Sequence, residues 1–352
     1  MALKKPENKG YVKLTIFLTY ECLFSCSHCF VRKGGYFPNS RLSIEELDTL
    51  FKVLRKYFTE FDVGWGGGEV YCLGKEFMKR LVESEFFNKE GVVNTLATTL
   101  CYPIDSDWID ILNRFKFIIT SIDRSHQKNR NFDIRRIKEN IEKLSIPVYI
   151  SYTPHLEDDE AYIDFIFSEF SGVKNVKSIL FGMLYTKDFL PISHVIKLFT
   201  YFEKKLEEYG MSSLWTDVSE YTPFPSWIGY NCFANALFVS KEVVTPCYPL
   251  YAFKNLIPYK FQNEIPVISF KDFLDNPEKL FSMTENFVKE YYLSVENFPE
   301  ECRRCRYYGL CRRGCPFFAI ETNKREYYCP LYQRAFEIYF KKLKGGMGNG
   351  KN

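Results

Sequence analysis

The sequence predicts a mixed α/β fold built around a parallel sheet. Short apolar runs rich in β-branched and aromatic residues alternate with segments whose apolar residues recur at helical spacing, six times within about the first 210 residues. Strands that alternate with helices pair in parallel through right-handed crossovers. Six such units suit either a doubly wound sheet or an incomplete barrel, and in both the functional site lies at the carboxyl ends of the strands.

The elements follow one another in a regular order. Strands are expected at 11–18, 61–65, 92–100, 116–123, 146–154 and 176–184. The helices that follow them are expected at 43–58, 75–87, 105–115, 133–144, 159–170 and 191–210. Ser43 and Glu46 form a capping box at the start of the first helix, and Gly210 ends the last one.

The pattern changes after about residue 212. Residues 216–233 are rich in Pro, Trp and Tyr and lack periodicity, and seven of the twelve cysteines lie between there and residue 330. We therefore expect a core domain at 1–214 and a smaller domain at 215–343 that metal holds together more than a large core does. Residues 330–343 read as its closing helix, and 344–352 as a disordered tail.

Composition excludes several classes of protein. The chain has 352 residues and is 46% hydrophobic, so a globular protein with a sizeable core is expected, and a net charge of +3 is too small to indicate nucleic acid. No run of about 18 apolar residues indicates a membrane span. The basic N-terminus leads into a short apolar run without a small-residue cleavage site, so no signal peptide is expected. Twelve cysteines in a cytoplasmic, reducing setting suggest metal or redox chemistry.

The first chemical motif is "ECLFSCSHCF", which follows the first predicted strand. It holds Cys22, Cys26 and Cys29 at C-x3-C-x2-C spacing. Three thiolates can bind three irons of a [4Fe–4S] cube and leave the fourth iron open for chemistry. The alternative is a zinc knuckle in which His28 supplies the missing ligand.

This spacing resembles the signature of the radical S-adenosylmethionine (radical SAM) superfamily, in which SAM chelates the open iron. "GWGGGEV" at the end of the second predicted strand is similar to the G-G-E-P motif that contacts the SAM amino group: Gly67, Gly68 and Glu69 match, and Val70 replaces Pro. The resemblance implies a partial (β/α)6 TIM-like barrel. It also implies a role in SAM ribose binding for Ser121 and Asp123 after the fourth strand, although Asp123 reads equally well as a helix cap.

The C-terminal cysteines resemble the SPASM extension of this superfamily. Cys302, Cys305, Cys311, Cys315 and Cys329 give C-x2-C-x5-C-x3-C-x13-C, and Cys232 and Cys247 lie upstream. The resemblance implies two auxiliary [4Fe–4S] clusters, hence three in all. One would take Cys302, Cys305, Cys311 and Cys329, and the other only Cys232, Cys247 and Cys315. Glu242 stands where the family has Gly. The alternative is a pair of zinc ribbons.

Two cysteines remain, Cys72 and Cys101, both expected near the mouth of the site. A thiol there can donate a hydrogen atom to a substrate radical, as the similar peptide epimerases do, but small packed hydrophobes are the commoner use of such residues. His126, His155 and His194 are expected to be structural or surface residues.

The resemblance implies an enzyme that reductively cleaves SAM to a 5′-deoxyadenosyl radical and abstracts a hydrogen atom from a substrate. A peptide or protein substrate is expected first, with an electron donor such as flavodoxin or ferredoxin. The chain begins almost at the first strand, which weakens the case for a leader-binding maturase. A small molecule or tetrapyrrole is the alternative substrate, and an iron–sulfur electron carrier or a zinc-binding module is the alternative class.

Overall fold

The computed structural model describes most of the chain. The described residues are 10–26, 29, 31, 40–128, 132–182, 190–211, 233, 235–252, 265–290, 299–307 and 329–348. His28 and the predicted ligands Cys232, Cys311 and Cys315 lie outside them.

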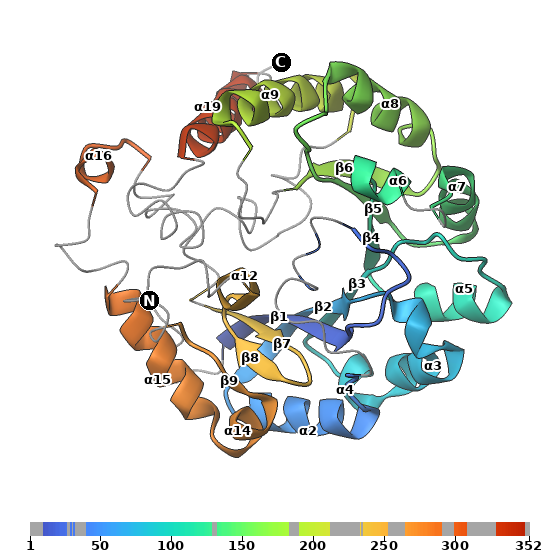
Figure 1. The fold of residues 1–352 in the computed structure, drawn as a ribbon, viewed down its shortest axis with the longest axis vertical. Coiled ribbons are helices and arrows are strands. Elements are labelled where there is room, and N and C mark those ends of the chain that lie inside the picture. The colour runs from blue at the N-terminus through green and yellow to red at the C-terminus, as the bar shows by residue number, and fades with distance from the viewer. Residues whose placement is uncertain are drawn as a thin grey trace.

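Six parallel strands form the main part of the sheet. They are β1 (Gly10–Thr19), β2 (Phe58–Gly67), β3 (Val92–Ala97), β4 (Phe117–Ser121), β5 (Val148–Tyr152) and β6 (Val176–Phe181). Each pairs with the next in chain order, and the connecting helices line the outer side of the curved sheet (Figure 1). The predicted mixed α/β fold with a partial six-stranded barrel is therefore confirmed.

The helices between these strands fall inside the predicted segments. They are α2 (Ile44–Leu54), α3 (Lys75–Glu83), α4 (Glu85–Asn88), α5 (Ser106–Leu112), α7 (Ile134–Lys143), α8 (Glu160–Phe170) and α9 (Ile192–Glu208). The single helix expected at 75–87 is in fact two, because the extended backbone of Ser84 (φ −64°, ψ 149°) separates α3 from α4. The short helices η1 (Val70–Leu73) and α6 (Arg124–Gln127), which the sequence did not predict, follow β2 and β4.

The core lies between the sheet and the outer helices. Val12, Leu14, Ile16 and Leu18 alternate along β1 and are fully buried, as expected for a strand covered on its outer face. Trp65 is also fully buried, and its indole N–H donates to the Asn94 side chain at 2.8 Å. This bond satisfies the one polar atom of the largest core residue.

The segment after residue 235 extends the same sheet. β7 (Ala236–Val239) pairs in parallel with β1, and the antiparallel β8 (Val243–Thr245) and β9 (Ile268–Ser269) complete a nine-stranded sheet among the described residues. The sequence had suggested a loop-rich region here, because strands of two to four residues carry too little periodicity to detect. Its helices are α12 (Tyr248–Ala252), α14 (Phe270–Asp275), α15 (Pro277–Val288), α16 (Glu300–Arg303) and α19 (Cys329–Gly348).

Helix α19 continues past residue 343, where the sequence predicts a tail to begin.

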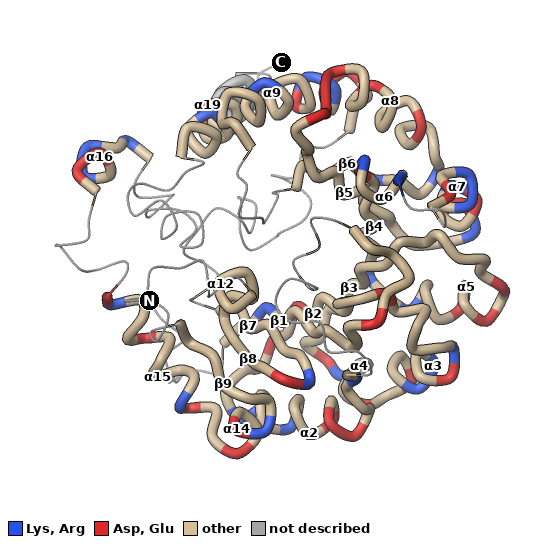
Figure 2. The backbone as a smooth tube through the Cα atoms, viewed as in Figure 1, with Lys and Arg blue, Asp and Glu red and all other residues tan. Residues whose placement is uncertain are grey.

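Charged residues gather on the outer helices, whereas the strands carry few (Figure 2). No helix in the described part of the chain is long and apolar enough to cross a membrane.

Candidate metal centre

Cys22, Cys26 and Cys29 lie on the loop that follows β1, as the sequence predicted. Cys22 and Cys26 are half-buried against the main core, and Cys29 packs against a smaller apolar cluster made by Phe17, Tyr20, Val31 and Tyr248. The Cys29 amide donates to the Cys26 carbonyl at 3.2 Å, so the loop turns back on itself between these thiols. All three thiols are close enough to influence one another electrostatically.

The three thiols leave both expected kinds of site to be weighed, and His28, the fourth ligand of a zinc knuckle, lies outside the described residues. A zinc ion needs its ligands about 2.0–2.3 Å from one point, and no three Cys, His, Asp or Glu side chains among the described residues meet that need. A [4Fe–4S] cube instead takes each thiolate on a different iron, so its ligands stand farther apart. Burial raises the pKa of the Cys22 thiol to about 12, so the free chain keeps this thiol protonated and cluster binding must release the proton.

A hydrogen-bonded seam joins the cysteine loop to the turn after β2. The Gly68 amide donates to the Thr19 carbonyl, and the Glu69 amide donates to the Glu21 carbonyl, both at 2.7 Å. The two predicted motifs, about 45 residues apart in sequence, are thus side by side at the carboxyl edge of the sheet. We call these two bonds the β1–β2 seam.

The glycines of this turn are required by the seam. Gly67 has φ +112°, and a Cβ on it would lie 2.6 Å from the Thr19 carbonyl oxygen. A Cβ on Gly68 would collide with the Glu21 carbonyl oxygen and the Tyr20 carbonyl carbon. Glycine, which has no Cβ, permits this close approach of the turn to the cysteine loop.

The Glu69 carboxylate is fully buried beside the seam. It accepts hydrogen bonds from the Thr98 hydroxyl at 2.5 Å and from the Thr99 amide at 2.9 Å. Burial raises the pKa of Glu69, and these hydrogen bonds oppose that rise by stabilising the ionised form. Thr98 and Thr99, just beyond the end of β3, thus orient this carboxylate.

The loop after β3 positions Cys101. Leu100 has φ +54°, a conformation that side chains with a Cβ rarely adopt, and the Asn140 amide donates to the carbonyls of Leu100 and Tyr102 on either side. Cys101 is 2% exposed, and its thiol lies 3.6 Å from the Thr99 carbonyl. Burial raises the pKa of Cys101 to about 11.

Cys72, in η1, is more accessible than Cys101. It is half-buried, and burial together with the nearby Glu69 and Glu21 charges raises its pKa. Tyr71, next to it, stacks on Tyr102 and Trp108 at 4.7 and 4.3 Å between ring centroids. Tyr71, Tyr102 and Trp108 therefore form one aromatic cluster that joins η1 to α5.

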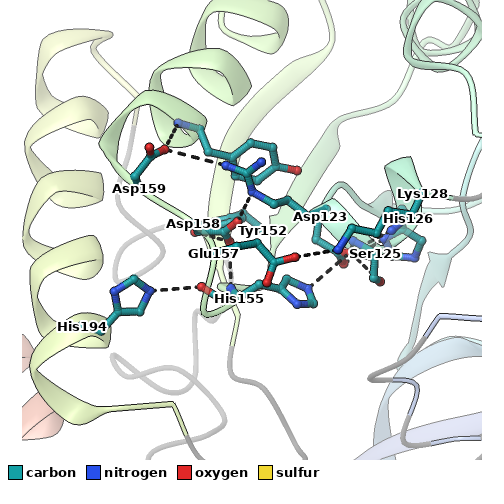
Figure 3. A network of polar contacts seen from close by, with 12 residues as sticks. Asp123, Ser125, His126, Lys128, Tyr152, His155, Glu157, Asp158, Asp159 and His194 are labelled. Carbon is teal, nitrogen blue, oxygen red and sulfur yellow. Dashed lines mark hydrogen bonds and ion pairs between the residues drawn. The ribbon is translucent and has the colours of Figure 1, made fainter.

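Ser121 is the last residue of β4, and Asp123 lies two residues beyond it (Figure 3 shows Asp123). The surroundings of the two side chains differ. Ser121 is half-buried on the strand. Asp123 is fully buried, and its Oδ1 accepts from the amides of Ser125 and His126 and from the Ser125 hydroxyl, at 2.8–3.0 Å. Asp123 is thus the N-cap of α6, the second of the two readings that its sequence position allowed.

His126 is the residue that sequence analysis undervalued. Its Nδ1 lies 2.8 Å from Asp123 Oδ2. Burial lowers the pKa of this imidazole, but hydrogen bonds to Asp123 and Cys26 and the charges of both groups outweigh burial and raise it to about 10. The signal in the sequence was the Asp-x-x-His spacing, which places both side chains on the first turn of one helix.

Three of the four predicted ligands of the distal auxiliary cluster are described. Cys302 and Cys305 lie in and just after α16, and Cys329 begins α19. The Gln333 amide, one turn along α19 from Cys329, lies 3.9 Å from the Cys305 sulfur. Arg306 pairs with Glu337 at 3.0 Å, and Tyr307 packs on Phe336. These contacts bring the C-x2-C segment to the start of α19.

Cys247 lies at the start of α12, just beyond β8, and its amide donates to the Thr245 hydroxyl at 3.2 Å. Glu242, where the family has Gly, occupies the β7–β8 turn without positive φ. Its carboxylate hydrogen bonds to Ser40 and Ser240, and neighbouring Lys241 pairs with Glu46. The departure from the family pattern thus ties this hairpin to the start of α2.

Comparison with known proteins defines the fold. No protein-family model and no curated protein sequence match the chain. Solved structures of native anSMEcpe with bound AdoMet, and of native anSMEcpe with bound AdoMet and Cp18Cys peptide, each cover 96% of this chain and 100% of their own at TM-score 0.71, with 19% and 20% identity. This chain has the fold of anSMEcpe. A third structure, with AdoMet and Kp18Cys peptide, covers 96% of this chain and 99% of its own at TM-score 0.71 and 19% identity.

The comparison therefore shows the fold, which this chain shares with a protein solved with bound AdoMet. The cysteine loop, the Gly67–Glu69 turn and the C-x2-C segment occupy one continuous α/β framework. The ligands, reaction and substrate of this chain are the subject of the proposal that follows.

Proposed function

We propose that this chain is a radical SAM enzyme that binds a [4Fe–4S] cluster through Cys22, Cys26 and Cys29. The observation that carries the proposal is the β1–β2 seam, which holds the three-cysteine loop against the Gly67–Glu69 turn at the carboxyl edge of a parallel sheet. A structural zinc site or an electron carrier has no need of such a turn beside its ligands. The fold shared with anSMEcpe supports the same reading.

Glu69 is the proposed contact for the SAM amino group. An ionised carboxylate has about four acceptor positions, and Thr98 and the Thr99 and Tyr71 amides supply three donors. Acceptor capacity therefore remains for an ammonium group, whose charge would lower the pKa of the buried carboxyl. When bound, the cluster supplies the electron that cleaves SAM to methionine and a 5′-deoxyadenosyl radical, which takes a hydrogen atom from the substrate.

The C-terminal cysteines are proposed to hold two auxiliary clusters in a domain at 215–343. Cys302, Cys305 and Cys329 would bind the distal cluster together with Cys311, and Cys247 would bind the nearer one with Cys232 and Cys315. The approach of Gln333 to Cys305 supports the first set, because it brings the C-x2-C segment to the helix that Cys329 begins. An electron donor such as flavodoxin or ferredoxin, and a reducing cytoplasm, suit this chemistry.

A peptide is the proposed substrate. The support is the fold, which is that of a protein solved with bound peptides. Ser121 remains a candidate for the SAM ribose. Of the two candidate hydrogen-atom donors, we favour Cys72 over Cys101, because Cys72 is half-buried and Cys101 is 2% exposed with its thiol directed at a carbonyl.

Anaerobic reconstitution tests the cofactor assignment. About twelve irons per chain, four in each of three cubes, and 5′-deoxyadenosine on addition of SAM and dithionite are expected. Cys26→Ala should abolish SAM cleavage, whereas Cys305→Ala should mainly destabilise the C-terminal domain and block substrate turnover. Zinc instead of iron, or SAM cleavage that survives the loss of Cys26, would contradict the proposal.

A separate experiment tests the substrate class. Cp18Cys peptide deuterated at its cysteine is supplied with SAM and reductant, and deuterium is sought in 5′-deoxyadenosine by mass spectrometry. Transfer of deuterium from the peptide is expected. Rapid SAM cleavage without deuterium transfer from this or other cysteine peptides would argue against a peptide substrate while leaving the radical SAM assignment intact.

A further inference from the structure

The β1–β2 seam lies at the beginning of the N-terminal cysteine loop. Its two hydrogen bonds use the carbonyls of Thr19 and Glu21, whereas Cys29 stands eight residues beyond Glu21. The Cys29 end of the loop is contacted by a different part of the protein, which comes from the C-terminal third of the chain.

The Cys29 end packs against α12, which lies beside β1 (Figure 1). Tyr248, the first residue of α12, is 1% exposed and belongs to the small apolar cluster against which Cys29 packs. Its ring meets Phe17 of β1 edge-on, at 4.7 Å between centroids. Its hydroxyl donates to the carbonyl of Val31, 217 residues earlier, at 3.3 Å. Tyr248 therefore holds the chain just beyond Cys29 by packing and by one buried hydrogen bond.

Tyr248 directly follows Cys247, a proposed ligand of the nearer auxiliary cluster. The Cys247 amide donates to the Thr245 hydroxyl at 3.2 Å, and the Cys247 carbonyl accepts from the Tyr251 amide at 3.3 Å. These two bonds fix the backbone on both sides of Cys247. One short segment thus carries a ligand of the C-terminal set and the residue that contacts the N-terminal loop.

We propose that Tyr248 is a positioning residue that fixes the Cys29 end of the N-terminal loop and makes iron binding at Cys247 and at Cys29 depend on each other. The inference rests on the proposed function, because it requires both cysteines to bind iron.

The physical basis of this coupling is conformational entropy. A loop that brings three thiols to one cube loses backbone freedom when it binds. Contacts that order the loop beforehand reduce that loss and so strengthen binding. Iron at Cys247 would restrain the start of α12, and with it the hydroxyl of Tyr248 that holds the Val31 carbonyl. Since coupling between two binding sites is reciprocal, iron at Cys29 would strengthen binding at Cys247 by the same factor.

Hydrogen exchange of the full chain tests the contact without relying on activity. The iron-free wild type is compared with Tyr248→Phe, which keeps the ring in the apolar cluster and removes the hydroxyl. We call the peptide that contains Cys29 and Val31 the loop peptide. It should exchange about 2- to 10-fold faster in this variant, the effect of one lost hydrogen bond. Peptides from β3 and β5 should keep their wild-type rates, whereas a general loss of stability would raise exchange in all of them.

Tyr11→Phe is the matched control. The Tyr11 hydroxyl donates to the Asp62 carboxylate at 3.2 Å near the opposite end of β1, so this variant loses the same kind of bond away from the loop. Exchange of the loop peptide should stay at the wild-type rate.

A second measurement tests the dependence between the two sites. The double variant Cys22→Ala/Cys26→Ala prevents cluster binding by the N-terminal loop, so reconstitution loads the C-terminal cysteines alone. This loading should slow exchange of the loop peptide. Addition of Tyr248→Phe to the double variant should reduce the slowing, and addition of Cys247→Ala should abolish it.

Three results would overturn the inference alone. They are a wild-type rate for the loop peptide in Tyr248→Phe, an equal acceleration in Tyr11→Phe, and no slowing in a double variant that has bound iron. A wild-type chain that binds no iron would instead overturn the proposed function, and the dependence between the sites with it. The exchange rates of the iron-free variants would not change with that outcome, so the two failures can be told apart.

Discussion

The two cysteine regions of this protein are held in place by different forces. The Cys22–Cys29 loop is fixed by backbone hydrogen bonds to β2 and lies against the main core. The Cys302–Cys305 segment is held to α19 by side chains: Arg306 to Glu337, Tyr307 to Phe336, and Gln333 to Cys305. The first region is built into the sheet, whereas the second depends on helix packing and on whatever its cysteines bind.

The difference predicts which region can fold without the proposed clusters. A parallel sheet with buried strands supplies its own stability, so we expect the β1–β2 seam to form without a cluster. Small cysteine-rich segments that bind metal instead gain much of their folding free energy from it, which is about 10–16 kcal/mol for structural zinc in isolated fingers. Under the proposed function, the seam would position reacting groups before the cofactor binds, and the C-terminal segment would not need to.

Removal of iron should have the largest effect and should separate the two regions. Chelation under anaerobic conditions is expected to expose the amides of α16 and the residues up to Tyr307 to hydrogen exchange. The amides of β1 and β2 should stay protected, because their partners are backbone carbonyls of the sheet. Exchange mass spectrometry of the holo and iron-free forms measures this. Equal loss of protection in both regions would show that they depend on iron to the same extent.

Gly68→Ala should disrupt the β1–β2 seam and destabilise the Cys22–Cys29 region. Its Cβ would overlap the Glu21 carbonyl, so the seam must open, at a cost of about 3–5 kcal/mol in unfolding free energy. Gly74→Ala is the matched control: Gly74 has φ +78° and ψ 160° but open space where a Cβ would stand, so only the conformational cost of about 1–3 kcal/mol is expected. Urea denaturation measures the unfolding free energy of both variants. Equal losses would show that the close contact between Gly68 and the Glu21 carbonyl does not matter for stability.

Glu69→Gln should change how the stability of the protein depends on pH. Burial raises the folded pKa of Glu69 above its ordinary value of 4.5. Between 4.5 and that raised pKa the folded chain retains a proton that the unfolded chain has lost, so stability falls as pH rises through this window. The glutamine variant lacks this decline and should be more stable than wild type above pH 4.5, with no such gain below it.

Thermal melts of the SAM-free protein from pH 5 to 8 measure the effect. The same variant should bind SAM more weakly, because it has lost the proposed partner of the ammonium group. A variant with the wild-type pH slope and wild-type SAM affinity would contradict both expectations.

Glu337→Gln should have the smallest effect. The pair with Arg306 lies on the surface, and exposed salt bridges contribute about 0–1 kcal/mol. Phe336→Ala, one residue away and fully buried, should cost about 3–5 kcal/mol. Chemical denaturation of the two variants ranks the forces in the C-terminal region. A loss for Glu337→Gln as large as that for Phe336→Ala would show that ion pairing holds this region instead.

Most helices and strands of the barrel could be predicted from local sequence patterns. The six β-α units, the Ser43 cap and the order of the motifs depend on periodicity within 10–15 residues, which a sequence displays directly. The break at Ser84 and the short strands β7–β9 were missed. Ser84 lies inside a continuous helical pattern, and β7 pairs with β1, which lies more than 200 residues away, before β8 and β9 can add to it.

The sequence by itself determined the chemical types present: three thiols at C-x3-C-x2-C, a Gly-Gly-Glu turn after the second strand, and a seven-cysteine C-terminal set. Only the tertiary structure decided what these residues touch. It assigned Gly67 and Gly68 to the seam, and Thr98 to Glu69. Spacing encodes neighbours along a helix or strand, whereas a contact between the ends of two strands exists only after the sheet has brought those strands together.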